Sequence, residues 1–506
     1  MKTSSEVLNT INVLERKFPV ATWRAGDIDL WPVYRIRLYT NATSGFLMSE
    51  PRIGTVETLL RIGRRGFRAL LRVPIAALRD RRKNAMPARG TTAVFLSDGV
   101  SFTRLSGLWI DRIVDPLIEI LDQRGVRSLK LTPQAEAHIP RKVASKFVQP
   151  QIDRLKLLSQ NKDASVVLPE FEQFLAAARE VFGSHAPDLR WLVRQATRLD
   201  ALAKWFCGIL SETGARYAFV NTYYGLEGMA FVQAARRLGL VSADLQHGMQ
   251  GPFHVAYAKW ANVPDSGYST MPDEFWVWSH READAINAWR GPGPANLPRI
   301  TGNLWLEQWQ ETSDPVLEPY RRQASRMRAQ LPSRTQVLVC LSWGLAEAEA
   351  DKLMEAAVLS GPGVSWWWRL HPVERGRCAE FSARLAGRGL DGRQVRDVTD
   401  MPLPPLICAV DVLVAHSSTA IQEAAQLGVP SVITSDYGSE LHAELVRDGI
   451  ALVATAPPDI VSAVIALSGH ACRQSARRAE RRIDINALIE EAMSPVVKQA
   501  SRAPAS

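Results

Sequence analysis

Short apolar runs alternate with longer amphipathic stretches from residue 91 onward, and this alternation organises most of the chain. The runs are four to six residues long with few charges, as in strands buried on both faces of a sheet. The first series of predicted strands is AVFLSD (93–98), SLKL (128–131), SVVL (165–168), YAFVN (217–221), SADLQ (242–246) and FWVWS (275–279). Helical periodicity fills the gaps, as in LEGMAFVQAARRLG (226–239). Strands separated by helices predict a parallel sheet with crossover helices.

The same alternation restarts after a segment rich in proline and glycine, GPGPANLPRITGN (291–303). The second series of predicted strands is 337–342, 365–370, 411–416, 431–435 and 451–454, with helices at 347–359, 419–428, 440–449 and 459–468. We therefore predict an α/β protein with two Rossmann-like domains, 91–310 and 311–475, followed by a C-terminal helix and tail, 476–506. Two such domains in one chain favour a ligand cleft between them.

Residues 1–90 follow neither pattern and are predicted to be a helical, basic appendage with an aromatic cluster near its start. Its final part, 52–83, is rich in arginine and is opposed by only Glu57 and Asp80. Leucine, isoleucine and phenylalanine interleave with the arginines at roughly helical spacing. This composition suits either a helix lying on the anionic inner-membrane surface or an ordinary solvated helix face packed on a domain.

Composition narrows the partners and the compartment. The 506 residues are 46% hydrophobic and carry a net charge of +9, which suits a folded protein with acidic partners such as nucleotides. No nucleic-acid recognition motif accompanies the charge, so nucleic acid is not an expected partner. The five cysteines lack paired spacing, which favours a reducing cytoplasm. Neither a signal peptide nor a run of about 18 apolar residues is present, so we expect a cytoplasmic protein, peripheral at most.

RLHP (369–372) stands at the end of an aromatic predicted strand. Open α/β sheets place ligand groups at strand ends, so Arg369 and His371 could both donate to a phosphate there. The alternative is that His371 is a structural histidine with satisfied hydrogen bonds.

AHSSTAIQEAAQLGVPSV (415–432) carries a second constellation of polar residues. Its strand delivers Ser417, Ser418 and Thr419 to the start of a helix, where free backbone N–H groups favour an anion. One of these hydroxyls could simply cap the helix. Glu423 lies about one turn further, where its carboxylate could accept hydrogen bonds from vicinal ribose hydroxyls.

LQHGMQG (245–251) follows a strand late in the first domain. A neutral imidazole at a cleft wall can take the proton of an attacking hydroxyl, so His247 is the candidate general base, with a binding or structural role as the alternative. Its neighbours Gln246 and Gly248 are candidate acceptor or cleft residues, and His254 is a weaker substitute for the base. In the loop after the first predicted strand, Asp98 and Arg104 could bind acceptor or donor, or could belong to an ordinary loop.

These motifs resemble known enzymes over residues 215 to 455. Glu followed by AAxxGxP, after a serine-rich strand end, resembles the donor-binding segment of glycosyltransferases with the two-domain GT-B fold. His371–Pro372 followed by Ser417–Ser418 resembles the CMP-binding motifs of bacterial sialyltransferases and capsule Kdo transferases. On this resemblance His371 and the two serines would contact the donor phosphate, and Glu423 the ribose.

The chain also departs from that pattern. Where sialyltransferases have an acidic pair followed by glycine, this sequence has Gln246, His247 and Gly248, which is more similar to the His-Gly element of teichoic-acid glycerophosphotransferases. FWVWSHREADAIN followed by RITGN resembles the crossover of GT-B enzymes and UDP-GlcNAc 2-epimerases, and implies that Gly302 and Asn303 line the cleft near the donor.

The resemblance implies a metal-independent glycosyltransferase with no cofactor besides its nucleotide sugar. The donor would be a CMP-activated acidic sugar such as Kdo or a sialic-type acid, and the acceptor a surface polysaccharide or a glycolipid such as lipopolysaccharide. Two alternatives remain: an isomerase similar to UDP-GlcNAc 2-epimerase, and a catalytically inactive GT-B fold that serves as a binding or assembly subunit.

Overall fold

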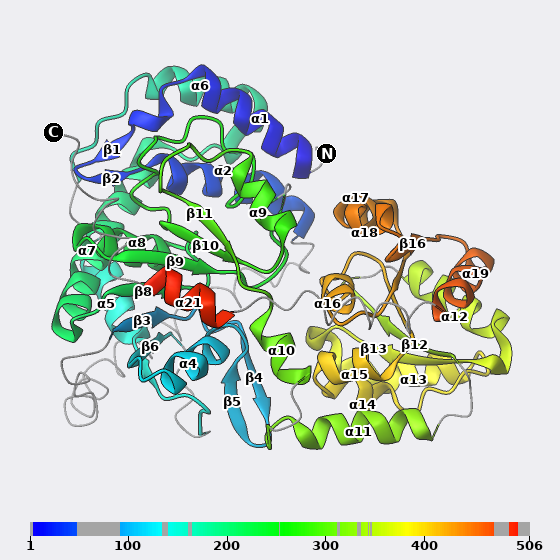
Figure 1. The fold of residues 1–506 in the computed structure, drawn as a ribbon. Coiled ribbons are helices and arrows are strands. Elements are labelled where there is room, and N and C mark those ends of the chain that lie inside the picture. The colour runs from blue at the N-terminus through cyan, green and yellow to red at the C-terminus, as the bar shows by residue number, and fades with distance from the viewer. Residues whose placement is uncertain are drawn as a thin grey trace. The chain divides into compact units, whose positions relative to one another are not determined.

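A computed structural model describes residues 4–47, 92–133, 140–159, 164–251, 254–310, 314–330, 335–342, 344, 347–469 and 485–493. The predicted basic helix at 52–83 lies outside them. The chain forms two compact units, one comprising Met1–Asn303 with Ile485–Ser506 and the other Leu304–Asp484. Figure 1 shows the ribbon of both units.

The first unit is built on a seven-stranded sheet in which every neighbouring pair of strands is parallel. Its strands, in spatial order, are β11 (Leu297–Ile300), β10 (Glu274–Val277), β9 (Val241–Leu245), β8 (Tyr217–Val220), β3 (Ala93–Leu96), β6 (Ser128–Thr132) and β7 (Ser145–Phe147). From β3 the chain proceeds to β6 and β7 on one side and then returns to β8 on the other. The strand order therefore reverses between β3 and β8.

Helices and two small hairpins surround this sheet. The helices are α1 (Ser4–Lys17), α2 (Trp31–Leu47), α4 (Val114–Gln123), α5 (Gln149–Leu158), α6 (Phe171–Phe182), α7 (Leu189–Thr213), α8 (Leu226–Arg237), α9 (His280–Asn287) and α21 (Ile485–Met493). The hairpins pair β1 (Arg24–Ala25) with β2 (Ile28–Asp29), and β4 (Phe102–Leu105) with β5 (Leu108–Asp111). The predicted strand at 165–168 is absent, and in its place Val167 makes an isolated bridge to Arg24.

The N-terminal residues are part of the first unit's core rather than an appendage. Trp23, Trp31 and Tyr34 are fully buried, and all three pack edge-on against Phe174 of α6. They share one hydrophobic cluster with α7 and with the strands β3 and β8. The aromatic residues noted in the sequence thus close one side of the first domain, and burial of these large side chains explains why the segment folds onto it.

The second unit is built on a five-stranded parallel sheet. Its strands, in spatial order, are β13 (Val364–Arg369), β12 (Thr335–Cys340), β14 (Val412–Ala415), β15 (Ser431–Ile433) and β16 (Ala451–Val453). Its helices are α10 (Leu304–Gln310), α11 (Glu318–Ala329), α12 (Glu347–Leu359), α13 (Cys378–Ala386), α14 (Val395–Asp400), α15 (Leu403–Ala409), α16 (Ala420–Gln426), α17 (Asp436–Leu441), α18 (Ala443–Arg447) and α19 (Pro457–Ser468). Here the strand order reverses between β12 and β14. Two successive Rossmann-like α/β domains confirm the predicted fold class.

The unit boundaries differ from the predicted domain limits at both ends of the second unit. The division falls after Asn303, because α10 packs with the second unit, against α15, although 310 was expected. The C-terminal helix α21 packs on the first unit: Glu490 and Glu491 form ion pairs with Arg124 and Arg299, and Ile489 is buried. The first domain is therefore assembled from both ends of the chain.

Candidate functional site

The polar residues of the first domain converge where its strand order reverses. Open α/β sheets bind ligands beyond the carboxyl ends of the strands at such a switch point. Asp98, just after β3, accepts hydrogen bonds from Asn221 Nδ2 (3.1 Å), Thr222 Oγ1 (2.8 Å) and the Val100 amide (2.9 Å), while its own amide donates to Asn221 Oδ1 (2.8 Å). Asp98 thus joins the loop after β3 to the loop after β8, and its carboxylate already accepts three hydrogen bonds from these loops.

A buried charged network lies beneath this loop. Ser97 Oγ donates to Asp111 Oδ2 at 2.5 Å, and the Asp111 amide donates to Asp115 Oδ2 at 2.9 Å. Asp115 forms an ion pair with Lys130, which lies on β6. Burial raises the pKa of Asp115 to about 7, although Lys130 opposes the shift. The network fixes the end of β3 and the β4–β5 hairpin; Arg104 lies on this hairpin at an exposed position opposite Trp109.

His247 lies beyond the end of β9 among aromatic rings. Its Nε2 is 3.1 Å from the hydroxyl of Tyr224, whose ring also packs against His254 at 5.3 Å between centroids. Burial lowers the pKa of His247, an effect that the Asp98 carboxylate opposes, and burial lowers the pKa of His254 to about 3. Both imidazoles are therefore neutral near pH 7, which is the state that can accept a proton. Each ring has one nitrogen in a hydrogen-bonding contact, since His254 Nδ1 accepts from the Ala256 amide and His247 Nε2 lies at the Tyr224 hydroxyl.

A buried carboxyl group supports these rings. Asp244, on β9, accepts hydrogen bonds from the Tyr223 amide (3.0 Å) and the Tyr257 hydroxyl (2.8 Å). Burial raises the pKa of Asp244 to about 8, so the carboxyl is largely protonated at neutral pH. Sequence reasoning missed Asn221, Thr222, Tyr224 and Asp244. The polar and aromatic run that directly follows the strand YAFV was the available signal for the first three.

The N-terminal helices hold the loop that carries His254. Arg35, fully buried on α2, donates to the carbonyls of Val255, Ala258 and Lys259 and lies 3.9 Å from the centroid of the Trp260 ring. Glu15 on α1, also fully buried, lies 3.5 Å from Arg35 Nε. Removing one partner of such a buried charged pair is costly.

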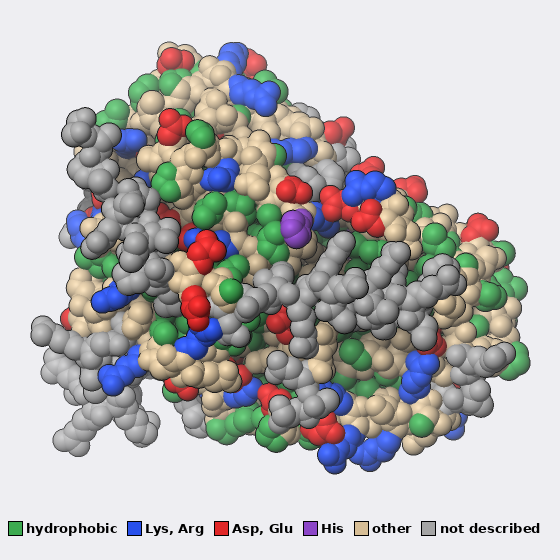
Figure 2. Space-filling view, in the orientation of Figure 1, with side chains coloured by type: hydrophobic (Ala, Val, Ile, Leu, Met, Phe, Trp, Pro, Cys, Tyr) green, Lys and Arg blue, Asp and Glu red, His purple; other side chains and the backbone are tan. Residues whose placement is uncertain are grey.

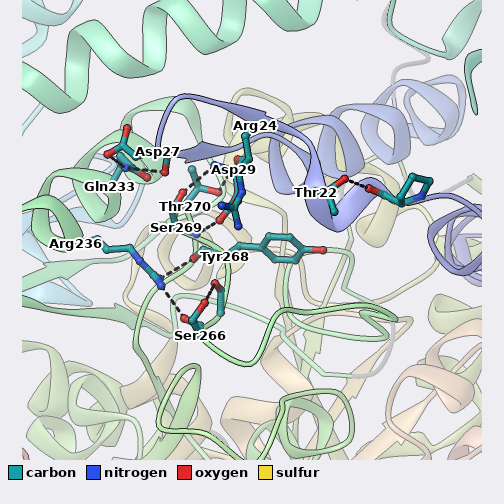
Figure 3. Close-up of polar contacts among 12 residues, drawn as sticks. Thr22, Arg24, Asp27, Asp29, Gln233, Arg236, Ser266, Tyr268, Ser269 and Thr270 are labelled. Atoms are coloured by element: carbon teal, nitrogen blue, oxygen red, sulfur yellow. Dashed lines mark hydrogen bonds and ion pairs between the residues drawn. The ribbon is translucent and has the colours of Figure 1, made fainter. Parts of the chain in front are cut away.

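The β1–β2 hairpin fastens the next part of the same loop (Figure 3). Asp29 accepts from the Ser269 amide at 2.7 Å and forms an ion pair with Arg24 at 3.0 Å, and its own amide donates to Ser269 Oγ. Arg236 of α8 donates to the carbonyl oxygens of Ser266 and Tyr268. The candidate site of the first domain therefore depends on the residues that precede its sheet.

The other first-domain candidates have mainly structural contacts. Gln246 is buried; its Nε2 donates to the Gly248 carbonyl and its Oε1 accepts from the Trp278 amide, so it links the ends of β9 and β10. Gly248 borders open space. Gly302 has φ of 71°, which favours glycine, and the buried Asn303 ends the first unit.

In the second domain, the RLHP residues lie at the carboxyl end of β13. Arg369 Nη1 donates to the carbonyl oxygens of Val398 and Met401, each at 2.6 Å, so this guanidinium holds the end of α14. His371 Nδ1 accepts from the Val373 amide at 3.3 Å and caps the turn that begins at the exposed Pro372. Burial lowers the pKa of His371; the Glu374 carboxylate opposes this shift, and Arg369 adds to it. His371 is thus neutral, and half-buried at the sheet edge.

The serine segment lies at the switch point of the second sheet, between β12 and β14. Ser417 Oγ lies 3.2 Å from His416 Nδ1, and Ser418 Oγ accepts from the Ala420 amide at 3.2 Å, which makes it a local cap. Thr419 is exposed. Glu423 belongs to α16, a helix of seven residues. Burial raises the pKa of Cys340, the last residue of β12, to about 12; Arg369 opposes this shift, and the charge of Glu423 adds to it. Glu423 therefore lies near the end of β12.

The loops after β14 and β15 approach each other closely beside these serines. Ser435 Oγ donates to the His416 carbonyl at 2.9 Å and accepts from the Gly438 amide at 2.9 Å. A Cβ at position 438 would lie 2.0 Å from the His416 carbonyl oxygen, so only glycine fits there. The backbone before Ser417 is thus fixed by its neighbour strand.

On the face shown in Figure 2, acidic and basic side chains are intermixed. Within the described ranges, no group of three or more His, Cys, Asp and Glu side chains is arranged to hold a metal ion. No described helix has the length and apolar character needed to cross a bilayer.

No protein-family model matches the sequence, and no curated protein matches it. Solved structures similar to this chain include UDP-glucose:anthocyanidin 3-O-glucosyltransferase in complex with UDP (12% identity, TM-score 0.48, 79% of this chain and 99% of the other). They also include the UDP-GlcNAc 2-epimerase from Neisseria meningitidis bound to UDP-GlcNAc (12% identity, TM-score 0.45, 76% of this chain and 93% of the other). A third is the UDP-GlcNAc 2-epimerase from Methanocaldococcus jannaschii (10% identity, TM-score 0.43, 74% of this chain and 92% of the other). At such low identity, function must be argued from the side chains.

Proposed function

We propose that this protein is a glycosyltransferase that uses a nucleotide-activated sugar, with the donor bound by the second domain and the acceptor activated by the first. The observation that carries the proposal is the placement of the polar motifs at the switch points of two Rossmann-like sheets. Asp98 and Thr222 meet at the first, and Ser417 and Glu423 lie at the second. Ligands of open α/β sheets bind at such points.

In the second domain, the hydroxyls of Ser417 and Ser418 would donate to the donor phosphate. His371, at the end of β13, would contact the same phosphate. The Glu423 carboxylate would accept hydrogen bonds from the ribose. Because Arg369 already donates to two carbonyl oxygens, we assign it the support of α14 and leave phosphate recognition to the other side chains.

In the first domain, His247 would act as the general base. The acceptor hydroxyl attacks the anomeric carbon, the bond from that carbon to the phosphate oxygen breaks, and the hydroxyl proton moves to the imidazole. A neutral histidine is required, and burial lowers the pKa of His247. The Tyr224 hydroxyl at Nε2 would orient the ring.

The donor we propose is a CMP-activated acidic sugar of the Kdo or sialic type, without a metal ion. The acceptor would be a surface polysaccharide or glycolipid at the cytoplasmic side of the inner membrane. The protein would contact this membrane through residues 52–83. The choice of CMP is supported by the resemblance of the His-Pro and Ser-Ser motifs to the CMP-binding motifs of bacterial sialyltransferases and capsule Kdo transferases.

A nucleotide panel tests the donor. CMP should raise the melting temperature of the full-length protein by mass action, and a Ser417→Ala/Ser418→Ala variant should lose the shift. Thr434→Ala is the matched control, since that hydroxyl is buried beyond β15. Stabilisation by UDP or GDP without stabilisation by CMP would overturn the proposed cytosine nucleotide. The proposed transferase activity would still stand.

Product analysis separates transfer from isomerisation. A transferase releases free nucleotide in step with a new glycosidic bond, whereas an isomerase converts one sugar nucleotide into another without net release. A protein that binds nucleotide but yields neither product with candidate acceptors would be a binding subunit, contrary to the proposal.

A further inference from the structure

The second domain has a cavity of about 350 Å³ beside the edge strand β13, away from its switch point. It is lined by Val358 at the end of α12, by Trp366 and Trp368 of β13, and by Arg388, Leu390 and Gln394 between α13 and α14. The lining runs from Val364 to Trp368 along β13, whereas His371 follows the end of the strand. At about 3.3 Å per strand residue, Trp366 lies roughly 16 Å from His371 along the strand.

A fixed indole ring forms one wall of this cavity. Trp366 stacks on Trp368 with 6.1 Å between centroids and 24° between planes, and Trp368 is buried against Phe381. The Trp366 indole N–H donates to Ser360 Oγ at 2.9 Å. Trp366 itself is only partly buried, so a rigid aromatic surface borders the cavity.

The charged side chains around the cavity are already paired. Arg388 bonds to Asp351 at 2.7 Å, and Asp391, which also lines the cavity, bonds to Arg393 at 2.8 Å. A phosphate or carboxylate ligand would have to compete with these ion pairs. Gln394 adds an amide, which carries both a donor and an acceptor.

We propose that this cavity binds one pyranose unit of a neutral saccharide, with the sugar ring stacked on Trp366. The weakly positive C–H face of a pyranose suits the negative face of an indole, and its hydroxyls suit an amide and partly exposed ion pairs. The volume lies within the range of small-molecule pockets, roughly 300–1,000 Å³. This saccharide site is separate from the proposed donor site and does not depend on the proposed transfer reaction.

Fluorine NMR of the full-length protein labelled with 5-fluorotryptophan tests the saccharide site. The Trp366 resonance is identified by its loss in Trp366→Phe. Titration with maltotriose, cellotriose and chitotriose should shift this resonance saturably at millimolar concentration for at least one of the three. The resonance of Trp23, buried in the first unit, should stay fixed. An unchanged or linearly drifting Trp366 resonance with all three would overturn the proposal, as would a response to CMP or UMP in place of the saccharides.

Two variants sharpen this result. Val358→Phe fills the cavity from a position that is 50% exposed, so it should abolish the shift without disturbing the core. Trp366→Leu should weaken binding roughly tenfold, measured by saturation transfer to the saccharide, because one aromatic stacking contact is lost. Val13→Phe, at an exposed valine of the first unit, is the control. Saccharide binding that survives both cavity variants would place the bound sugar elsewhere.

Discussion

The switch points of the two sheets differ in how their polar residues are held. In the first, Asp98 is joined to Asn221 and Thr222 across two loops, above a buried charged network. In the second, Ser417 and Ser418 make hydrogen bonds within two residues of themselves. The hydrogen bonds of the first region come from the protein itself, which suits the preorganised geometry that a catalytic group requires. The second presents partly exposed hydroxyls that a phosphate would order. This difference fits the proposal that the first domain supplies the chemistry and the second domain the binding.

Replacing His247 is the most severe test of that division. His247→Ala should lower kcat by roughly a hundredfold to ten-thousandfold while donor affinity stays nearly unchanged, because a positioned base is lost and the proposed donor residues are intact. Steady-state kinetics and calorimetric titration with the nucleotide measure the two effects. His280→Ala, at an exposed histidine of α9, is the control. If donor binding falls in proportion to the rate, His247 is a binding residue.

The contribution of the buried Arg35–Glu15 pair to the stability of the first region can be tested by mutation. Arg35→Leu should lower the free energy of unfolding by about 3–5 kcal/mol, because Glu15 is left buried without its partner. Denaturant unfolding measures the change. Arg37→Leu, two residues along the same helix and exposed, should cost much less. Equal losses for the two variants would mean that the buried pair contributes little.

The binding role of the second region predicts a smaller effect at Glu423. Glu423→Ala should weaken nucleotide binding by roughly 1.5–3 kcal/mol, the usual contribution of hydrogen bonds to a charged group, and should leave the fold intact. Calorimetric titration gives the affinity, and circular dichroism checks the fold. The exposed Glu440, changed to alanine, is the matched control. Unchanged affinity in Glu423→Ala would return this residue to a structural role.

The buried carboxyl of Asp244 predicts a pH dependence confined to the first region. Its pKa is about 8 in the folded protein against 3.8 ordinarily, so between these values the folded state holds a proton that the unfolded state has released. The stability contributed by Asp244 is therefore present at low pH and lost as pH rises toward 8. Relative to Asp244→Asn, the wild type should lose up to about 1.4 kcal/mol per pH unit in that window. Denaturant unfolding at several pH values measures the free energy of unfolding of both proteins. The ionisation of Asp115 affects both equally, so it cancels in the comparison. Parallel profiles would show that Asp244 ionises normally.

Three central strands could be predicted from the sequence because all their residues are buried and apolar. The runs at 93–98, 217–221 and 411–416 correspond to β3, β8 and β14. β7 and β11 have partly buried residues throughout, so no apolar run marked them. Residues at strand ends, such as Asp98 and Ser417, could be found by position alone.

What the sequence could not reveal depends on contacts between distant residues. Arg35 bonds to carbonyls more than 200 positions away, as its separations of 220 and 223 from Val255 and Ala258 show. Nothing near Arg35 in the sequence distinguishes it from the exposed Arg37. The pKa of Asp244 likewise depends on burial beneath Tyr223 and Tyr257, which hydrophobic periodicity does not report.

The return of α21 to the first unit makes the second domain an insertion, bounded by Asn303 and Ile485, within a host domain. A fragment that ended before Ile485 would uncover the hydrophobic surface under Ile489 and Ala492 and lose the partners of Arg124 and Arg299. A fragment that began at Leu304 would carry α21 without the first unit, on which this helix packs. Joining Asn303 to Ile485 through a short glycine-serine linker is therefore the rational way to express the host alone, and simple bisection of the gene is not.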